Sequence, residues 1–72
     1  DNKIQIKQFD DLERTIKIFQ YDKLVVEKRI SDFEENLDGL EKILLIELDK
    51  GTYKVIISFL KKELLNKTIT IK

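Results

Sequence analysis

The chain has 72 residues, enough for one small domain built around a single hydrophobic core. Its residues are 42% hydrophobic and 39% charged, a balance too apolar for a disordered tail and too charged for a membrane span. Fourteen basic and fourteen acidic residues cancel, which argues against a general binder of nucleic acid or of anionic membranes.

Several residue types are missing, and their absence narrows the chemistry. The chain has no Cys, His, Met, Trp or Pro. Without Cys and His it lacks the usual ligands of structural zinc, haem and iron–sulfur clusters, and every Ser-His or Cys-His nucleophile pair. We therefore expect no metal, no cofactor and no enzymatic activity. No disulfide can form, so cysteine content does not decide the cellular compartment of the protein. We take the cytoplasm as the default expectation.

Six β-prone runs predict strands, three on each side of a polar segment. Aliphatic and aromatic residues dominate these runs, and in the first half they alternate with polar residues as in half-buried strands. In chain order the predicted strands are Lys3–Phe9, Arg14–Tyr21, Lys23–Ile30, Lys42–Leu48, Tyr53–Leu60 and Lys67–Ile71. No apolar run approaches the ~18 residues that a membrane helix needs, so no membrane span is expected.

Residues 10–20 fit two structures. Asp10 and Glu13 could cap a helix. Alternatively, a turn leads into a strand in which Ile16 and Ile18 point the same way. A shift of the sequence by 39 residues aligns this segment with one in the second half. There Gly51 lies in a short polar link between two β-rich runs, which is typical of a hairpin. This comparison favours the turn and strand.

The polar segment between the two sets of strands predicts a short helix over Asp32–Asp38. Ser31 is a favourable N-cap, and Glu34 three residues later completes a capping box. Gly39 stands where a C-cap residue belongs. The apolar stripe of this helix would consist of Phe33, Leu37 and Leu40.

The two halves resemble each other when the sequence is shifted by 39 residues. Lys3-Ile4 falls on Lys42-Ile43, and most apolar positions of the first half meet apolar positions of the second. Self-similarity at a fixed period is typical of repeated supersecondary units. We therefore predict one domain over residues 1–72 with an internal repeat that relates residues 3–30 to residues 42–69.

These elements predict an α+β fold. It would contain antiparallel sheet or sheets made from two related three-stranded units (βββ-α-βββ), with one short helix between them. The second half is apolar on both faces of its strands, so both faces need a cover. The helix and the first-half sheet would supply that cover, and a partner chain would replace the helix if it proved too short.

The favoured function is a non-enzymatic protein-binding or assembly module, with a protein partner or a second copy of the chain as its ligand. The last predicted strand is β-prone and lacks acidic residues, so it could pair with a partner strand. The candidate partner-binding residues, on that sheet edge or on the apolar face of the second half, are Thr68, Ile69, Thr70, Ile71, Leu44 and Ile46.

Two alternatives remain open. A single-stranded nucleic-acid binder would stack nucleobases on aromatic side chains that are flanked by basic residues. Its candidate residues are Lys17, Phe19, Tyr21, Lys28 and Arg29. Against it, the chain has no RNP-type motif and no net positive charge, so nucleic acid is not the expected partner. The other alternative is an engineered scaffold without a natural partner.

Two further motifs are weak. The acidic and amide residues of the polar segment alternate as in a calcium loop, but the glycine is misplaced and no glutamate closes the loop. Asn66-Lys67-Thr68 is an N-glycosylation triplet, which has meaning only in a secreted protein.

Overall fold

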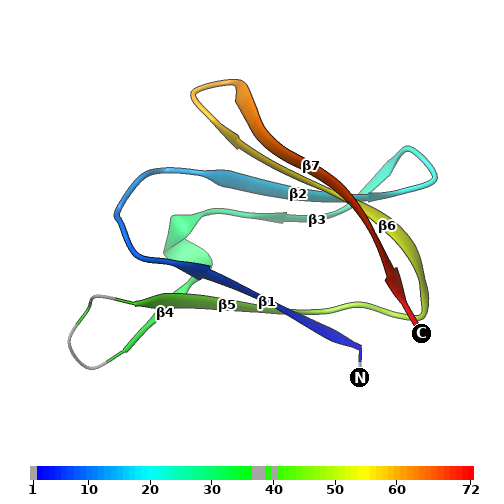
Figure 1. Ribbon diagram of the computed structural model, residues 1–72, viewed down its shortest axis with the longest axis horizontal. Coiled ribbons are helices and arrows are strands. Elements are labelled where there is room, and N and C mark those ends of the chain that lie inside the picture. Colours follow the sequence, from blue (N-terminus) through cyan, green and yellow to red (C-terminus); the bar gives the residue numbers. More distant parts are fainter. Residues whose placement is uncertain (1, 37–38, 40) are drawn as a thin grey trace.

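The residues that the structure describes fold into seven strands and one 3-10 turn. The computed structural model describes residues 2–36, 39 and 41–72 (Figure 1). The elements, in chain order, are β1 (Lys3–Gln8), β2 (Thr15–Gln20), β3 (Lys23–Lys28), the turn η1 (Ile30–Asp32), β4 (Glu34–Glu35), β5 (Lys42–Glu47), β6 (Gly51–Phe59) and β7 (Lys62–Ile71). Residues 15–17, which also fitted a helix, lie in a strand as the sequence favoured.

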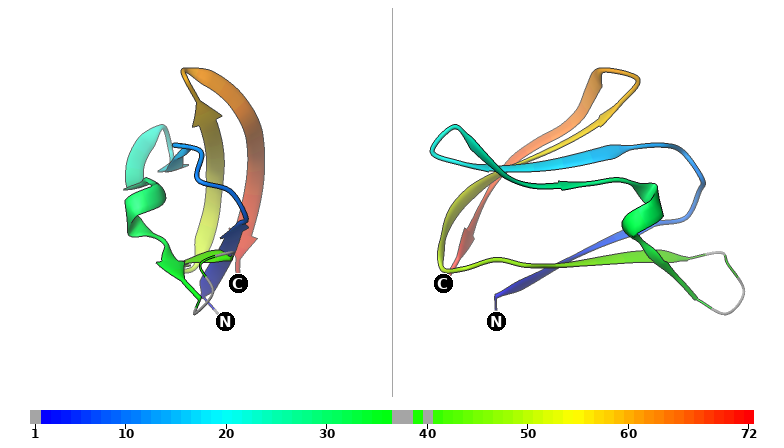
Figure 2. Two further views of the ribbon diagram at one scale, coloured as in Figure 1. Left: turned by 90° about the vertical axis from the view of Figure 1, so that its left-hand side faces the viewer. Right: turned by 180° about the vertical axis from the view of Figure 1, so that it is seen from behind.

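The strands form two antiparallel sheets that pack against each other (Figures 1 and 2). One sheet has three strands in the order β1-β5-β4, and the other has four in the order β3-β2-β6-β7. Both sheets join the two halves of the chain, because β1 pairs with β5 and β2 pairs with β6.

The core lies between the two sheets. Side chains alternate across each strand, so every second residue of β1, β2, β5 and β6 points inward. The buried hydrophobic residues are Ile16, Ile18, Phe33, Leu44, Ile46, Leu48, Tyr53, Val55 and Ile71. Ile4, Ile6, Val26, Ile57 and Ile69 pack against them and stay partly exposed.

The expected α+β class is wrong, because no α-helix forms over the described part of Asp32–Asp38. The backbone N–H of Phe33 donates to the Ile30 carbonyl at 3.1 Å and closes a single 3-10 turn, and the Arg29 N–H donates to the Asp32 carboxylate at 2.8 Å. Phe33 is extended and buried, and Glu34–Glu35 pair with β5 as β4. A helix of seven residues is marginal in water, so burial of Phe33 and strand pairing prevail over the capping residues. Leu37, Asp38 and Leu40 lie outside the described residues.

The hairpins β2–β3 and β6–β7 have the same construction 39 residues apart. Each begins its two-residue turn at matching positions, with positive φ at Tyr21 and Asp22 and again at Leu60 and Lys61. Each also carries one irregularity in its register, between residues 18 and 19 and between residues 57 and 58. All five residue pairs of β2 with β3 recur in β6 with β7 at this spacing.

The first strand of each half follows a different spacing. The pairing of β1 with β5 places Ile4 opposite Ile46 and Ile6 opposite Leu44, all facing the core. Under the repeat predicted from the sequence, these inward residues match at a spacing of 40, with Ile4 on Leu44 and Ile6 on Ile46. A uniform 39-residue shift would instead match the inward Ile6 with Leu45, which is 61% exposed. With this match, Ile16 follows Ile6 by 10 positions, whereas Val55 follows Ile46 by 9.

Candidate functional site

The two long sides of the sandwich differ. Strands β3 and β4 border one side, and the chain crosses it through η1 and Phe33; we call this the closed side (Figure 2). Strands β1 and β7 border the other side, where each has a neighbour among the described strands on one edge only; we call this the open side. An unpaired strand edge offers backbone N–H and C=O groups to another chain.

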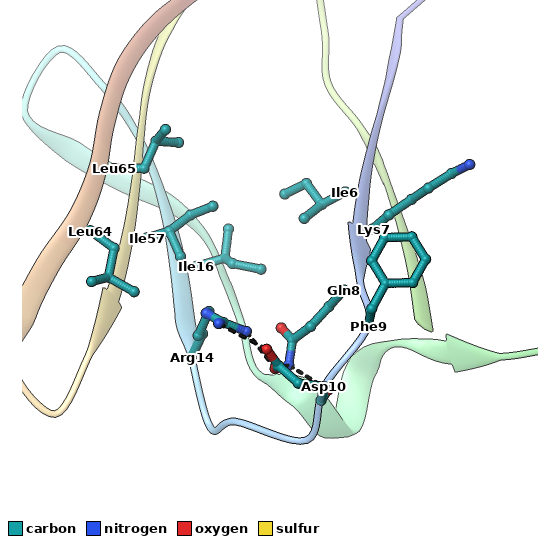
Figure 3. Close-up of a pocket in the computed structure, with 10 residues that line it drawn as sticks. All are labelled: Ile6, Lys7, Gln8, Phe9, Asp10, Arg14, Ile16, Ile57, Leu64 and Leu65. Carbon is teal, nitrogen blue, oxygen red and sulfur yellow. Dashed lines mark hydrogen bonds and ion pairs between the residues drawn. The ribbon is translucent and has the colours of Figure 1, made fainter. Parts of the chain in front are cut away.

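A groove runs along the open side between β1 and the β6–β7 hairpin. It consists of two adjoining hollows of about 380 and 280 Å³ that share Ile6, Ile57 and Leu65 in their walls. Figure 3 shows the larger hollow, with Ile6 facing Ile57, Leu64 and Leu65 across it, while the Phe9 ring lies beside Lys7 and points away from them. We call the two hollows together the open groove.

Apolar side chains remain accessible in the open groove. Phe9 is 70% exposed, Leu64 50% and Leu65 41%. Covering apolar surface contributes about 25 cal/mol per Å² removed from water, so a partner seated here would gain affinity from these side chains. Apolar walls beside an unpaired strand edge are the two features that β-strand addition uses.

The backbone of β1 presents alternate residues to the open side. The Leu48 N–H donates to the Asn2 carbonyl at 2.8 Å, which continues the ladder between β5 and β1. In an antiparallel ladder every second pair is hydrogen-bonded, so Ile4 and Ile6 bond to β5. The N–H and C=O groups of Gln5 and Lys7 therefore face the unpaired edge.

A polar cluster closes one end of the open groove. The Gln8 side-chain amide donates to the Leu12 carbonyl at 2.9 Å and to the Asp10 carboxylate at 3.0 Å. Arg14 donates two hydrogen bonds to the same carboxylate, at 2.7 and 3.1 Å (Figure 3). These bonds from Arg14 lower the pKa of Asp10 and raise the pKa of Arg14. Both charges are already paired, so neither is placed to serve as a catalytic acid or base.

The charge around the open groove is basic. Strand β1 carries Lys3 and Lys7 and no acidic residue, and Lys67 of β7 lines the smaller hollow. Lys7 lies 3.4 Å from Glu41, whereas Lys67 makes no ion pair with any residue that the structure describes. A ligand with negative charge would therefore fit this side better than a basic one.

The residues proposed from the sequence for partner binding separate into two groups. Leu44 and Ile46 are each 4% exposed and belong to the core, so a binding role does not fit their position. Residues 68–71 lie on the edge strand β7. There Thr68 and Thr70 are exposed, while Ile71 points inward and is buried.

The residues proposed for nucleic-acid binding do not form one surface. Lys17 and Phe19 lie on the outer face of the four-stranded sheet, and Tyr21 projects from the β2–β3 turn. Lys28 stands opposite the buried Ile16, so its side chain leaves from the inner face. Arg29 lies beyond the end of β3, with its guanidinium 3.8 Å from Glu27. No single strand of nucleic acid could contact all five residues.

Sequence reasoning missed the residues of β1 and of the start of β7 that line the open groove. Leu64 and Leu65 precede the last predicted strand, Lys67–Ile71, and they lie in β7, which begins at Lys62. The 39-residue shift could have identified Leu64 and Leu65 as strand residues, because it matches them with Val25 and Val26 of β3.

Other kinds of site receive no support from the residues that the structure describes. Among them no three Asp, Glu, His or Cys residues cluster to hold a metal ion. In the same part of the chain no helix has the length and hydrophobicity to cross a membrane. Comparisons with protein-family models, curated proteins and solved structures give no match.

Proposed function

We propose that this protein is a non-enzymatic protein-binding module that takes an extended segment of a partner along its open side. The observation that carries the proposal is the coincidence of an unpaired edge on β1 with the exposed apolar walls of the open groove. A segment added to β1 would gain backbone hydrogen bonds from Gln5 and Lys7. Its inward side chains would fill the groove.

A random heptapeptide library displayed on phage, panned on the protein, tests this function. Selected peptides should shift the amide resonances of Gln5 and Lys7 in the ¹⁵N-labelled protein. Gln5→Pro removes an outward N–H and leaves the β1–β5 ladder intact, so it should abolish binding. Gln5→Ala keeps the N–H and is the matched control.

Two results would contradict the proposed function. One is a failure of the library to yield any binder. The other is a set of binders whose shifts fall on the outer face of the four-stranded sheet, around Lys17 and Phe19. Urea unfolding of the Gln5→Pro variant checks that the loss of binding does not come from loss of the fold.

We also propose that the two halves are copies of one three-stranded unit that pair as two subunits of a dimer would. The support is the matching turns, register irregularities and residue pairs of the two hairpins. The pairing of β2 with β6 is symmetric about Lys17 and Ile56, and that of β1 with β5 about Gln5 and Leu45. Both pairings are those that a two-fold axis through the sandwich would produce.

A further inference from the structure

The closed side contains a segment, η1 to β4, that covers one end of the groove equivalent to the smaller hollow of the open side. Beside it, a hollow of about 410 Å³ remains between β3 and β5, lined by residues 25–28 and 45–47. Phe33 leaves η1 in an extended conformation and is 9% exposed within the core cluster. The next two residues, Glu34 and Glu35, form β4 and pair with the outer edge of β5. The closed side therefore holds an aromatic residue in its groove and two acidic residues on its strand edge.

The correspondence between the halves places the same groove on the open side. The smaller hollow is lined by Ile4, Ile6, Val55, Ile57, Leu65 and Ile69. Their counterparts, 40 residues away for the β1 positions and 39 for the others, are Leu44, Ile46, Ile16, Ile18, Val26 and Ile30. Five of these pack in the same core cluster as Phe33. The open side has the same kind of apolar walls around a hollow of about 280 Å³.

The geometry points to one kind of ligand for the open side: an extended peptide with an aromatic residue followed by acidic residues, added antiparallel to β1. This inference rests on the proposed function and names the chemistry of its partner. The hollow is larger than a cavity of about 150 Å³ that holds benzene, so it can take an aromatic ring.

The register of the ligand follows from that of β4. Glu34 pairs with Ile43 of β5, so Phe33, one residue earlier, stands beside Leu44. On β1 the counterpart of Leu44 is Ile4, so the aromatic side chain of the ligand would stand beside Ile4. The first acidic residue would then pair with Lys3. The β1 edge and Lys67 supply positive charge where β4 brings negative charge.

The probe that tests this inference is a synthetic peptide of residues Ile30–Asn36, blocked at both ends and added to the intact ¹⁵N-labelled protein. The free peptide can extend over Ile30–Asp32, which form η1 in the folded chain. We therefore expect saturable shifts at Lys3, Gln5, Lys7 and Ile69, and weaker binding as salt is raised. The peptide with Phe33→Ala should bind at least tenfold more weakly. The peptide with Glu34→Gln and Glu35→Gln should bind several-fold more weakly and lose most of its salt dependence.

Variants of the protein separate the groove from general charge effects. Lys67→Glu should weaken the Ile30–Asn36 peptide several-fold, because it reverses the charge beside the hollow. Lys54→Glu makes the same change on the outer face of the four-stranded sheet and should leave the affinity unchanged. Equal effects of the two variants would overturn the inference.

The outcomes also separate this inference from the proposed function. Library peptides that bind β1 without an aromatic–acidic pattern, together with failure of the Ile30–Asn36 peptide, would overturn the inference and keep the function. Failure of both probes would overturn both. Concentration-dependent shifts of β1 without any peptide, with sedimentation as a dimer, would show that a second copy takes the edge and would also overturn the inference.

Discussion

Individual polar residues hold the connection between β1 and β2 in place. Asp10 accepts hydrogen bonds from Arg14, Gln8 and the Leu12 backbone N–H within one loop. The corresponding connection between β5 and β6 uses other chemistry, since the Tyr53 hydroxyl donates to the Asp49 carbonyl at 2.8 Å. The two connections are thus held by unrelated side chains.

The pKa of Asp10 predicts a dependence of stability on pH. Because Arg14 lowers this pKa below its ordinary value of 3.8 in the folded protein, the ionised carboxylate stabilises the fold at neutral pH. That stabilisation is present above the ordinary value and is lost as the pH falls through the lowered one. Asp10→Asn should reduce the urea midpoint at pH 7, and the difference from the parent protein should vanish in strong acid.

The control for that experiment is Glu13→Gln in the same loop. Glu13 is exposed and makes no hydrogen bond or ion pair with the described residues, so its neutralisation should leave the midpoint nearly unchanged. A difference between Asp10→Asn and the parent that stays constant from pH 7 to pH 2 would contradict the role assigned to the carboxylate.

Tyr53 gives a second test at the level of single residues. Its ring is 5% exposed and its hydroxyl bonds the Asp49 carbonyl, so Tyr53→Phe should lower the free energy of unfolding by about 1 kcal/mol. Tyr21→Phe makes the same chemical change on a ring that is 93% exposed and should have no measurable effect. Equal effects in urea unfolding would show that the Tyr53 hydrogen bond does not form.

Among the elements, the two hairpin turns carry unfavourable residues. Positive φ at both turn positions is typical of a type I′ turn, which favours Asn-Gly, whereas these turns hold Tyr21-Asp22 and Leu60-Lys61. A left-handed backbone costs an ordinary residue roughly 1–2 kcal/mol. The double variant Leu60→Asn, Lys61→Gly should therefore raise the free energy of unfolding by about 1–2 kcal/mol.

A glycine one residue further along controls for the turn effect. Lys62 begins β7, where glycine only weakens a strand, so Lys62→Gly should lower the stability by roughly 0.5–1 kcal/mol. If Lys62→Gly and the double variant Leu60→Asn, Lys61→Gly changed the denaturation midpoint in the same direction, the left-handed conformation at Lys61 would be contradicted.

The sequence predicted the strands better than it predicted what joins them. Alternation and β-prone composition located the six long strands, and the 39-residue comparison decided between helix and strand at Ile16. The pattern could not reveal β4, because two residues are too few for a period. It favoured a helix there because Ser31 and Glu34 have good capping chemistry, whereas the deciding term was the burial of Phe33 by residues distant in the chain.

The candidate site was only partly visible from the sequence. The edge strand around Thr68–Ile71 was identified as an edge, but its neighbour β1 was not. Finding β1 required the pairing order of the sheets, which depends on contacts between residues about 40 apart. Leu44 and Ile46 were proposed because the second half is apolar on both faces of its strands, and the structure places both on the face of β5 that packs in the core.

At the scale of the whole molecule, the pairing pattern predicts slow folding with one phase. Each half must find the other before β1 can pair with β5 or β2 with β6, and such distant pairing is typical of folding in milliseconds to seconds. The chain has no proline, so refolding should lack a phase of tens of seconds. Stopped-flow refolding from urea measures this, and a slow phase independent of protein concentration would contradict it.

Amide hydrogen exchange along β1 tests most directly whether this edge is open and built to accept a strand. In the protein alone, the N–H groups of Ile4 and Ile6 should exchange slowly and those of Gln5 and Lys7 quickly, because only the first two bond to β5. Saturation with the Ile30–Asn36 peptide should slow exchange at Gln5 and Lys7 by at least tenfold. Slow exchange at all four residues without peptide, or no change when it is added, would contradict the account.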